Sequence, residues 1–546
     1  MKKLLKNIIK SMPIVPQSWA FSVVEFIFLA KTTFRVSLSK YAYTPSKAVE
    51  TYCDYIRENI KRKSGQRHDF VLVDCFSVPQ WIMANSIFLN RLCEQLDTAI
   101  ASYGFAPREH TPDFLYRSFG AENHFRVSLT SAQRRRRNEI YLSIFKNSRT
   151  PEQLFNLHID GIWVGLDLYE SILRSGTATV NMDSYKARFT IYHGLRHFIF
   201  FYDLIQSGRV KAVAPSHDCY ATVGLLAKVA QRFGVPVFYA NPMTIMRSFK
   251  PHDLYQKYLN YPEIFASLPT EEQVKVKKSA KDALAKRVGG SAGVNMFYST
   301  KSAFTSNKLP RQTTASSKLK IIVATHCFYD NPHAYGKMTF RDFYQWLEFL
   351  GEISRKTDYE WYLKTHPDYR AGTLEILHEF MLKHPKFKLV DSNTTFHQLK
   401  EEGVSIALTA YGSIGHELPF LGYHVINASY NPHSRYKFNI NCKSREEYED
   451  VLMNLDALPP IKDIEKIYEF YATHHYLTES DNLLFESLSD YFTFADGDFL
   501  SDSCYEYFMR TPYDNIQRYS QHSDEFLASD YHYDFEMLLA KLGGST

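Results

Sequence analysis

Residues 405–426 read Ser405-Ile-Ala-Leu-Thr-Ala-Tyr-Gly-Ser-Ile-Gly-His-Glu-Leu-Pro-Phe-Leu-Gly-Tyr-His-Val-Ile426. The pattern predicts a buried strand, a Gly-Ser turn, a short helix and a second buried strand. Such a turn leaves the backbone N–H groups of residues 412–414 unpaired at a helix N-terminus, where the helix dipole favours an anion. Glu417 lies four residues beyond Ser413, on the same helix face and within reach of a ribose diol. The stretch therefore indicates either a nucleotide site or a structural corner of an α/β sheet.

The composition describes a globular protein of more than one domain. A chain of 546 residues is too long for a single core. Its 45% hydrophobic and 23% charged content is typical of soluble proteins. The net charge of +5 is mild and forms no dense basic stripe, which argues against a nucleic-acid binder. Seven cysteines without a Cys-x-x-Cys pair predict reduced thiols and a cytoplasmic location.

The N-terminus combines a cationic segment, residues 1–10, with a largely apolar one, residues 19–30. The apolar segment is too short to span a membrane, and the sequence between the two interrupts the form of a signal peptide. Lysines alternate with Leu and Ile in the first segment, as in a helix that lies on an anionic membrane or in an ordinary solvated helix. Four consecutive arginines, Arg134–Arg137, indicate either a solvated helix face or a contact to an anionic membrane or to the diphosphate of a lipid-linked acceptor.

Alternating strand and helix patterns predict an α/β fold with two Rossmann-like lobes of the GT-B type, which face a cleft, and with extra helices at both ends. Residues 76 to about 190 read as helical and irregular. The expected strands are His68–Cys75, Val210–Pro215, Val235–Ala240, Leu319–Ala324, Trp361–Lys364, Phe387–Val390, Ser405–Leu408 and His424–Ile426. The expected division is an N-terminal helical region (1–60), a first lobe (61–268), a linker (269–317), a second lobe (318–480) and C-terminal helices (481–546).

Three polar clusters in the second lobe directly follow predicted strands. They are Ala324–His333, Tyr362–Pro367 and the Gly-Ser turn. Ligands bind at the carboxyl ends of the strands in open α/β sheets. Lys364 and His366 supply donors suited to phosphate oxygens. Because all three clusters follow predicted strands, the nucleotide interpretation of the Gly-Ser turn is favoured over the structural one.

The three clusters resemble the nucleotide-binding lobe of GT-B glycosyltransferases. The likeness is to the bacterial capsule and lipopolysaccharide group that uses CMP-activated acidic sugars, such as retaining β-Kdo transferases. His366-Pro367 and Gly412-Ser413 match the two motifs that hold CMP in that group, and Glu417 matches the glutamate that GT-B enzymes commonly place near the nucleotide ribose. The resemblance implies a nucleotide site formed by His326, Asp330, His333, Lys364, His366, Tyr411, Gly412, Ser413 and Glu417.

The first lobe is expected to hold the acceptor and the reacting carbon. The stretch His158–Arg174 resembles an element of the same transferases, which implies that Asp160 and Arg174 bind the sugar or the acceptor. The alternative is that Asp167, Glu170 and Arg174 form an ordinary set of helix-surface ion pairs.

A second cluster, Ala214–Gly224, lies where a strand ends and a helix begins. Asp218 there is either the N-cap of that helix or a catalytic carboxylate, matched by the resemblance to an aspartate nucleophile. His252 is a candidate acid or base. The remaining candidates for contacts to the sugar or acceptor are His217, Tyr220, Arg247 and Lys250.

The expected function is transfer of Kdo or a related acidic sugar from a CMP donor to a bacterial surface polysaccharide or a lipid-linked acceptor. No metal or cofactor is expected, because the histidines show no zinc spacing and helix dipoles with basic groups can neutralise the leaving group. The expected location is cytoplasmic, with peripheral contact to the inner membrane. The alternatives are an enzyme like UDP-sugar 2-epimerases and a non-catalytic glycan-assembly protein.

Overall fold

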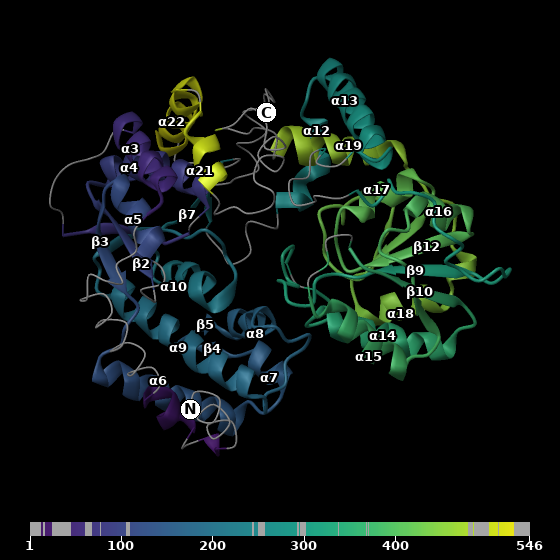
Figure 1. Ribbon diagram of the computed structural model, residues 1–546, viewed down its shortest axis with the longest axis horizontal. Helices are drawn as coiled ribbons and strands as arrows, with labels where there is room; N and C mark the ends of the chain where they lie inside the picture. Colours follow the sequence, from purple (N-terminus) through teal and green to yellow (C-terminus); the bar gives the residue numbers. More distant parts are fainter. Residues whose placement is uncertain are drawn as a thin grey trace. The chain divides into compact units, whose positions relative to one another are not determined.

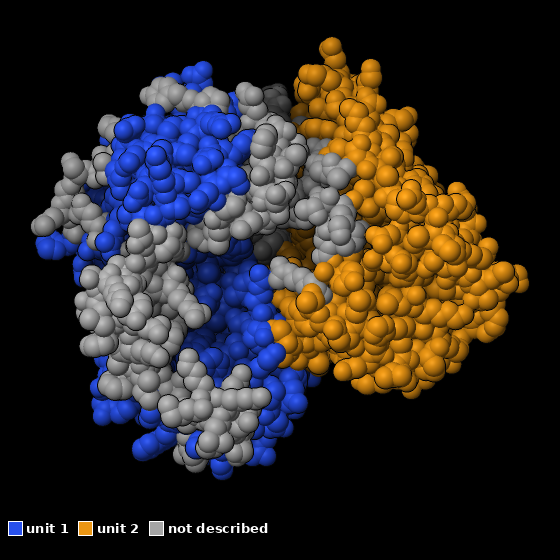
Figure 2. All heavy atoms as spheres, in the orientation of Figure 1, with its two compact units in different colours: residues 1–175, 180–251, 482–533 blue, residues 176–179, 252–481, 534–546 orange. Residues whose placement is uncertain are grey.

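The chain forms two compact units in the computed structural model (Figure 2). Unit 1 comprises residues 1–175, 180–251 and 482–533, and unit 2 comprises residues 176–179, 252–481 and 534–546. The residues that the structure describes are 12–14, 17–23, 45–60, 68–76, 78–104, 110–242, 245–248, 257–291, 294, 302–336, 338–366, 369, 371–478, 484, 502–511 and 513–528.

Unit 1 is built on a six-stranded sheet with the order β3-β2-β1-β6-β7-β8 (Figure 1). Its pairs are parallel except β7 with β8. The elements are α3 (Lys47–Asn59), β1 (Phe70–Asp74), α4 (Pro79–Leu96), β2 (Ala99–Gly104), α5 (His110–Ser118), β3 (Ala121–Arg126), α6 (Ser131–Asn147), α7 (Pro151–Phe155), β4 (His158–Ile159), β5 (Ile162–Trp163), α8 (Gly165–Arg174), α9 (Tyr185–Gln206), β6 (Val210–Ala214), the π-helix η3 (Tyr220–Gly224), α10 (Leu225–Arg232), β7 (Val237–Ala240), β8 (Ile245–Ser248), α21 (Asp502–Phe508) and α22 (Tyr513–Ala528).

Unit 2 repeats this plan with a parallel sheet of order β11-β10-β9-β12-β13-β14. Its elements are η4 (Lys257–Asn260), α12 (Tyr261–Ala266), α13 (Thr270–Val288), β9 (Lys320–Ala324), α14 (Phe343–Lys356), β10 (Glu360–Lys364), α15 (Thr373–Lys383), β11 (Phe387–Leu389), α16 (Phe396–Glu401), β12 (Val404–Thr409), α17 (Ile414–Phe420), β13 (His424–Asn427), β14 (Ile440–Asn441), α18 (Arg445–Met453), η5 (Leu455–Ala457), α19 (Glu465–Ala472) and η6 (Thr473–Thr478).

The central strands of unit 2, β9, β10, β12 and β13, are largely buried on both faces, as expected of a parallel sheet covered by helices. One core lies between the sheet and α14, α15 and α18, and it includes Trp346, Trp361 and Phe380. The other lies between the sheet and α13, α16, α17 and α19, and it includes Leu284 and Tyr423. Figure 1 shows the two helical layers on either side of β9, β10 and β12.

The predicted fold class, α/β with two Rossmann-like lobes, is confirmed by these two sheets. The cleft between the lobes stays a prediction. All eight predicted strands exist, with their ends moved by at most two residues. Strands β2 and β3 were not predicted, because their sequences, Ala99–Gly104 and Ala121–Arg126, are rich in small and polar residues rather than β-branched ones.

Two predicted boundary segments belong to the compact units. The segment 269–317, predicted as a linker, lies within unit 2, where α13 buries Ala280, Leu284 and Val288 against the second core. The described C-terminal helices belong to unit 1. Phe526 of α22 lies 6.3 Å from Phe88 of α4, measured between ring centroids. The cationic segment 1–10 lies outside the described residues.

Three further sequence-based points can be compared with the structure. All seven cysteines are free thiols. Among the described residues, no helix is long and apolar enough to cross a membrane. The four arginines of α6 do not form a uniformly solvated face: Arg137 is fully buried, and its guanidinium lies 3.9 Å from the ring centroid of Tyr192.

Candidate functional site

Both sheets reverse their strand order at one point, and polar groups meet across that point in each unit. The order reverses between β9 and β12 in unit 2 and between β1 and β6 in unit 1. In open α/β sheets, ligands bind in the crevice outside the carboxyl ends of the strands at this switch point. The carboxyl ends of the strands at these two switch points are therefore the candidate ligand sites.

In unit 2, His326 connects the ends of the two switch-point strands. Its Nε2 lies 2.9 Å from Thr409 Oγ1 at the end of β12. Its ring is stacked on Phe343, with 4.7 Å between centroids, and lies 4.8 Å from the ring of Tyr411. Burial and, to a smaller extent, the nearby His366 lower the pKa of His326 to about 3, so the imidazole is neutral at physiological pH.

The Gly-Ser turn has the geometry that its sequence predicts. Gly412 has a φ of +134°, a conformation that favours glycine. The N–H groups of Gly412, Ser413 and Ile414 donate no hydrogen bond to any acceptor in the described part of the chain. The turn therefore presents three backbone donors at the carboxyl end of β12, next to His326.

A buried histidine supports this turn from behind. Asn439 Nδ2 donates to His433 Nδ1 over 3.1 Å, so Nε2 carries the proton and donates to the carbonyl of Gly412 over 3.2 Å. A Cβ on Gly415 would lie 2.1 Å from His433 Cε1. The close approach of the ring thus requires glycine at position 415, and the bond to Gly412 holds the carbonyl of the turn in place.

Arg287 of α13 adds a cation beside the turn. Its Nε pairs with Glu417 Oε1, its Nη1 donates to the carbonyl of Val294 over 2.8 Å, and its Nη2 lies 3.5 Å from Ser413 Oγ. Glu417 is 2% exposed, so it is held by Arg287 in a buried pair instead of projecting into open solvent. The sequence pointed to Glu417 but not to Arg287, which lies 126 positions before Ser413 in a segment predicted as a linker.

The other residues predicted for the nucleotide site differ in their exposure and in their hydrogen-bond partners. Lys364 is buried and donates to the carbonyl of Ser392 over 2.7 Å, and burial lowers its pKa to about 8. His333 uses both ring nitrogens inside its own loop, accepting from the Met338 N–H and contacting the Arg341 carbonyl. His366 and Asp330 are exposed, and Tyr411 donates its hydroxyl to the carbonyl of Asn331 over 2.7 Å.

In unit 1, a buried carboxylate connects the two switch-point strands. Asp74 ends β1, and its two oxygens accept from the N–H and the hydroxyl of Ser216, each over 2.6 Å. Ser216 Oγ lies 2.9 Å from Nδ1 of His217, whose ring is exposed and packs edge-on against Phe76. Burial raises the pKa of Asp74 to about 6, although both bonds from Ser216 oppose the shift.

The backbone after this chain of bonds is unusual. Tyr220 has a φ of +66°, and it starts a π-helical turn. Both features are frequent at functional sites. Cys219 is the N-cap of that turn, so Asp218 is not, and the N-cap interpretation of Asp218 was wrong. Its side chain is half-buried.

The remaining candidates of unit 1 fall into separate places. Arg174 lies with its guanidinium 5.6 Å from the ring centroid of Tyr220, so these two predicted residues meet. Asp160 forms the left-handed turn between β4 and β5 and pairs with Arg136 over 2.5 Å at the surface. Arg247 lies on β8, opposite Phe238 of β7. The candidates His252 and Lys250 lie outside the described residues.

The predicted surface ion pairs of α8 were wrong. Asp167 and Glu170 are buried, and Asp167 pairs with Lys228 of α10 rather than with a residue of its own helix. Burial raises the pKa of Asp167, and the ammonium of Lys228 opposes that shift. The pair fixes α8 against α10, next to Gly224, where a Cβ would lie 2.2 Å from Asp167 Oδ1.

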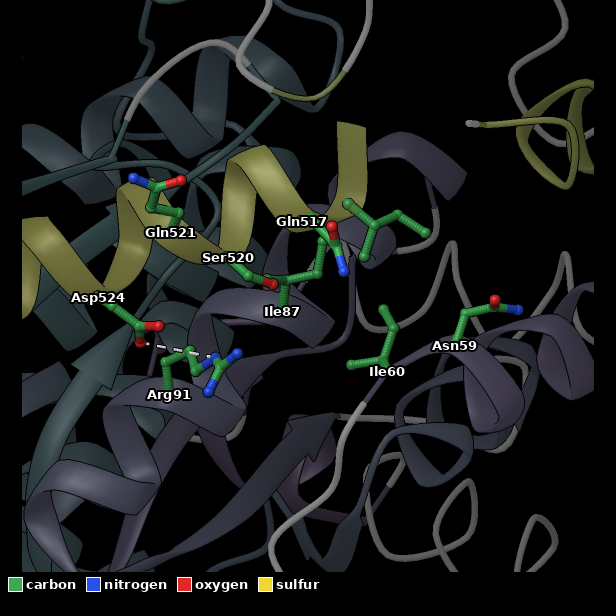
Figure 3. A pocket seen from close by; sticks show the side chains of 9 residues that line it. Asn59, Ile60, Ile87, Arg91, Gln517, Ser520, Gln521 and Asp524 are labelled. Atoms are coloured by element: carbon green, nitrogen blue, oxygen red, sulfur yellow. Dashed lines mark ion pairs between the residues drawn. The ribbon is translucent and has the colours of Figure 1, made fainter. Parts of the chain in front are cut away.

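A separate pocket of about 490 Å³ opens in unit 1 between α3, α4 and α22 (Figure 3). Arg91 and Asp524, 3.6 Å apart, form an ion pair at one side of it. Asn59, Gln517 and Gln521 contribute amides. None of the predicted site residues lines this pocket. Among the described residues, no group of three or more His, Cys, Asp and Glu side chains is arranged to hold a metal ion.

Comparisons with known proteins find similar chains among the solved structures, all at low sequence identity. No protein-family model matches it, and no curated protein matches its sequence. The Thermosulfurimonas dismutans KpsC, a beta Kdo 2,4 transferase, is similar with 13% identity and a TM-score of 0.30, over 48% of this chain and 79% of that one. UDP-GlcNAc 2-epimerase from Neisseria meningitidis is similar with 10% identity and a TM-score of 0.21, over 74% and 94%. S. aureus MnaA, solved with UDP, is similar with 12% identity and a TM-score of 0.23, over 79% of this chain and 97% of that one.

Proposed function

We propose that the chain is a glycosyltransferase that moves a sugar from a nucleotide donor to a bacterial surface-polysaccharide or lipid-linked acceptor. The preferred donor is a CMP-linked acidic sugar such as Kdo. One observation carries the proposal. Three N–H groups on the turn of residues 412–414, which meet no acceptor among the described residues, stand at the switch point of unit 2 beside the cation of Arg287.

The turn is suited to hold the phosphate of a nucleotide. Backbone N–H groups that converge on one point bind phosphate oxygens, and a nearby guanidinium adds charge. The imidazole of His326, neutral and stacked on Phe343, borders the same crevice. These fixed donors would stabilise the negative charge that develops on the departing phosphate, which is the largest demand of sugar transfer from a nucleotide.

The chemistry at the sugar would belong to unit 1. Asp218 would attack the anomeric carbon as a nucleophile or take the proton of the acceptor hydroxyl. Arg174 and Tyr220, which meet in the structure, would contact the sugar or the acceptor. His252, Arg247 and Lys250 remain candidates for the same step. Peripheral attachment at the inner face of the bacterial inner membrane would give access to a lipid-linked acceptor.

Two matched glycine variants test the phosphate site. Gly412→Ala strains a backbone with a φ of +134°, and the new Cβ would meet only His326 Cε1 at 3.6 Å. Gly422→Ala strains a φ of +78°, and the new Cβ would meet only the end of Lys400 at 3.7 Å. Each costs roughly 1–3 kcal/mol of strain. We expect the first to weaken nucleotide binding at least about tenfold and the second to leave it unchanged.

The measurement is calorimetric titration with CMP, CDP, UDP and GDP, which also identifies the base of the donor. Equal affinities in the two variants would remove the phosphate site from the turn. Incubation with the nucleotide sugar alone then separates transfer from epimerisation, because an epimerase converts the donor without any acceptor. Absence of transfer, hydrolysis and epimerisation for every nucleotide sugar would leave a non-enzymatic protein.

A further inference from the structure

The bonds of Asp74, Ser216 and His217 form a chain at the switch point of unit 1, and their order fixes where the protons are. Ser216 has one hydroxyl proton. When Asp74 is ionised, both of its oxygens can only accept, so the hydroxyl of Ser216 donates to Oδ2 over 2.6 Å. In the hydrogen bond of 2.9 Å between His217 Nδ1 and Ser216 Oγ, the donor must then be the Nδ1–H of the histidine.

This assignment determines the tautomer of His217. A neutral imidazole with its proton on Nδ1 carries its lone pair on Nε2. The ring is exposed, so Nε2 can meet a substrate hydroxyl. Without the bond to Ser216, nothing would hold an exposed histidine in this tautomer. The carboxylate that imposes it is 7% exposed and lies at the end of the neighbouring strand.

The chain of bonds lies at the position in a parallel sheet where ligands bind. Asp74 ends β1 and Ser216 follows β6, and these two strands pair at the point where the strand order reverses. The corresponding crevice of unit 2 holds His326 and the Gly-Ser turn. The left-handed Tyr220 and the π-helical turn follow within a few residues of His217. Unit 1 therefore has a built polar site where ligands of such sheets bind.

We propose that His217, and not Asp218, is the general base of unit 1 that takes the proton of the acceptor hydroxyl, and that Ser216 and Asp74 are positioning residues that keep its lone pair on Nε2. The inference rests on the proposed function. In the transfer step, the proton of the acceptor hydroxyl passes to Nε2 while the acceptor oxygen forms its bond to the anomeric carbon. The bond from that carbon to the leaving oxygen breaks, and its electron pair goes to the leaving group. The imidazolium then releases its proton to solvent.

The tautomer can be measured without any assay of activity. Long-range ¹H–¹⁵N correlation spectra of the intact chain, labelled at histidine, report which ring nitrogen is protonated, and His217→Gln identifies the signals. At pH 8 we expect the Nδ1–H form for His217. Ser216→Ala removes the acceptor and should shift the ring to the Nε2–H form. Ser216→Thr keeps a hydroxyl and should restore Nδ1–H.

Asp74→Asn provides a second route to the same result. If its carbonyl oxygen keeps the bond from the Ser216 N–H, its NH₂ group faces the hydroxyl of Ser216. The hydroxyl must then accept from Asn and donate to His217, which moves the histidine proton to Nε2. A wild-type ring in the Nε2–H form, or one whose tautomer ignores Ser216→Ala, would overturn the positioning role. A purely structural bond between β1 and β6 would change stability alone.

The transfer assay tests the catalytic role separately. His217→Gln should lower the rate of transfer by about 10²- to 10⁴-fold and leave nucleotide affinity unchanged, while the exposed His158→Gln should change neither. Ser216→Ala should lower the rate and Ser216→Thr should recover it. A wild-type rate in His217→Gln would overturn the general base and leave the proposed transferase standing. Absence of transfer in the wild type would instead overturn the proposed function, and the spectra would still decide the positioning role.

Discussion

Asp74 is a carboxylate whose folded environment favours its protonated form. Burial raises its pKa from 3.8 to about 6. Because the folded state then binds the proton more tightly than the unfolded chain, the free energy of unfolding falls as pH rises from about 3.8 to 6. Ser216 donates two hydrogen bonds to Asp74, whose charge acts on the nearby Tyr116. Burial raises the pKa of Tyr116 well above its ordinary value, so this hydroxyl stays neutral over the whole range from pH 3.8 to 6.

We therefore expect Asp74→Asn to stabilise unit 1 relative to the wild type above pH 6, by roughly 3 kcal/mol at most. The advantage should fade as pH falls toward 4, where the wild-type carboxyl is protonated. Urea unfolding of both proteins at several values between pH 4 and 7.5 measures the difference. Glu139→Gln, which removes an exposed carboxylate of α6, is the control and should show no such trend. A difference independent of pH would contradict the raised pKa.

Individual residues show how far sequence reasoning reaches. Gly412 and Ser413 were predicted as candidates because a strand, a glycine and a helix follow one another within ten residues, and the structure confirms that local order. Asp74 was not found, because its partner Ser216 lies 142 positions away. The end of a predicted strand was a usable signal for Asp74. The pairing of β1 with β6, which gives that signal its meaning, is a property of the sheet and not of the local sequence.

At the scale of elements, α13 determines the environment of the Gly-Ser turn. The helix is rich in lysine, and its apolar face is reduced to a few residues, such as Ala280 and Leu284. Periodicity alone therefore gives a weak signal. The helix is held by packing against α19 and by Arg287, whose partner Glu417 belongs to α17. Tertiary packing outweighs local propensity here, so the sequence did not distinguish this helix from a linker.

The pair of Arg287 and Glu417 can be tested as a unit. Arg287→Met leaves a buried carboxylate without its cation, which should cost about 3–5 kcal/mol of unfolding free energy. Adding Glu417→Met should recover part of that loss, since the unpaired charge is removed. Recovery will be incomplete, because Arg287 also donates to the carbonyl of Val294.

Denaturant unfolding of the two single variants and the double variant gives the coupling energy. Lys308→Met is the matched control, because it breaks an ion pair with Glu401 whose side chains are 75% and 62% exposed. It should leave stability nearly unchanged. Additive effects of Arg287→Met and Glu417→Met would show that the two side chains do not depend on each other.

At the scale of the whole molecule, the chain leaves unit 1, builds most of unit 2 and returns to unit 1 for α21 and α22. The alternation of strands and helices made the two sheets predictable, because each βα unit carries its own hydrophobic pattern. The return of the C-terminal helices to unit 1 was not predictable, because the sequence of α22 shows an apolar face but does not indicate which unit that face covers. Tyr505 of α21, 1% exposed and 5.3 Å from the ring of Tyr52, belongs to the contact that decides it.

This organisation predicts two separable unfolding transitions in differential scanning calorimetry. Tyr505→Ala removes a buried ring where α21 packs on α3, and it should cost about 3–5 kcal/mol in unit 1 alone. Tyr448→Ala removes a fully buried ring of α18 and should cost a similar amount in unit 2 alone. Each variant should lower one transition by several degrees and leave the other in place. A nucleotide held by the Gly-Ser turn should raise only the transition that Tyr448→Ala lowers, because binding stabilises the unit that contains the site. A single transition that both variants lower would mean that the two units unfold as one.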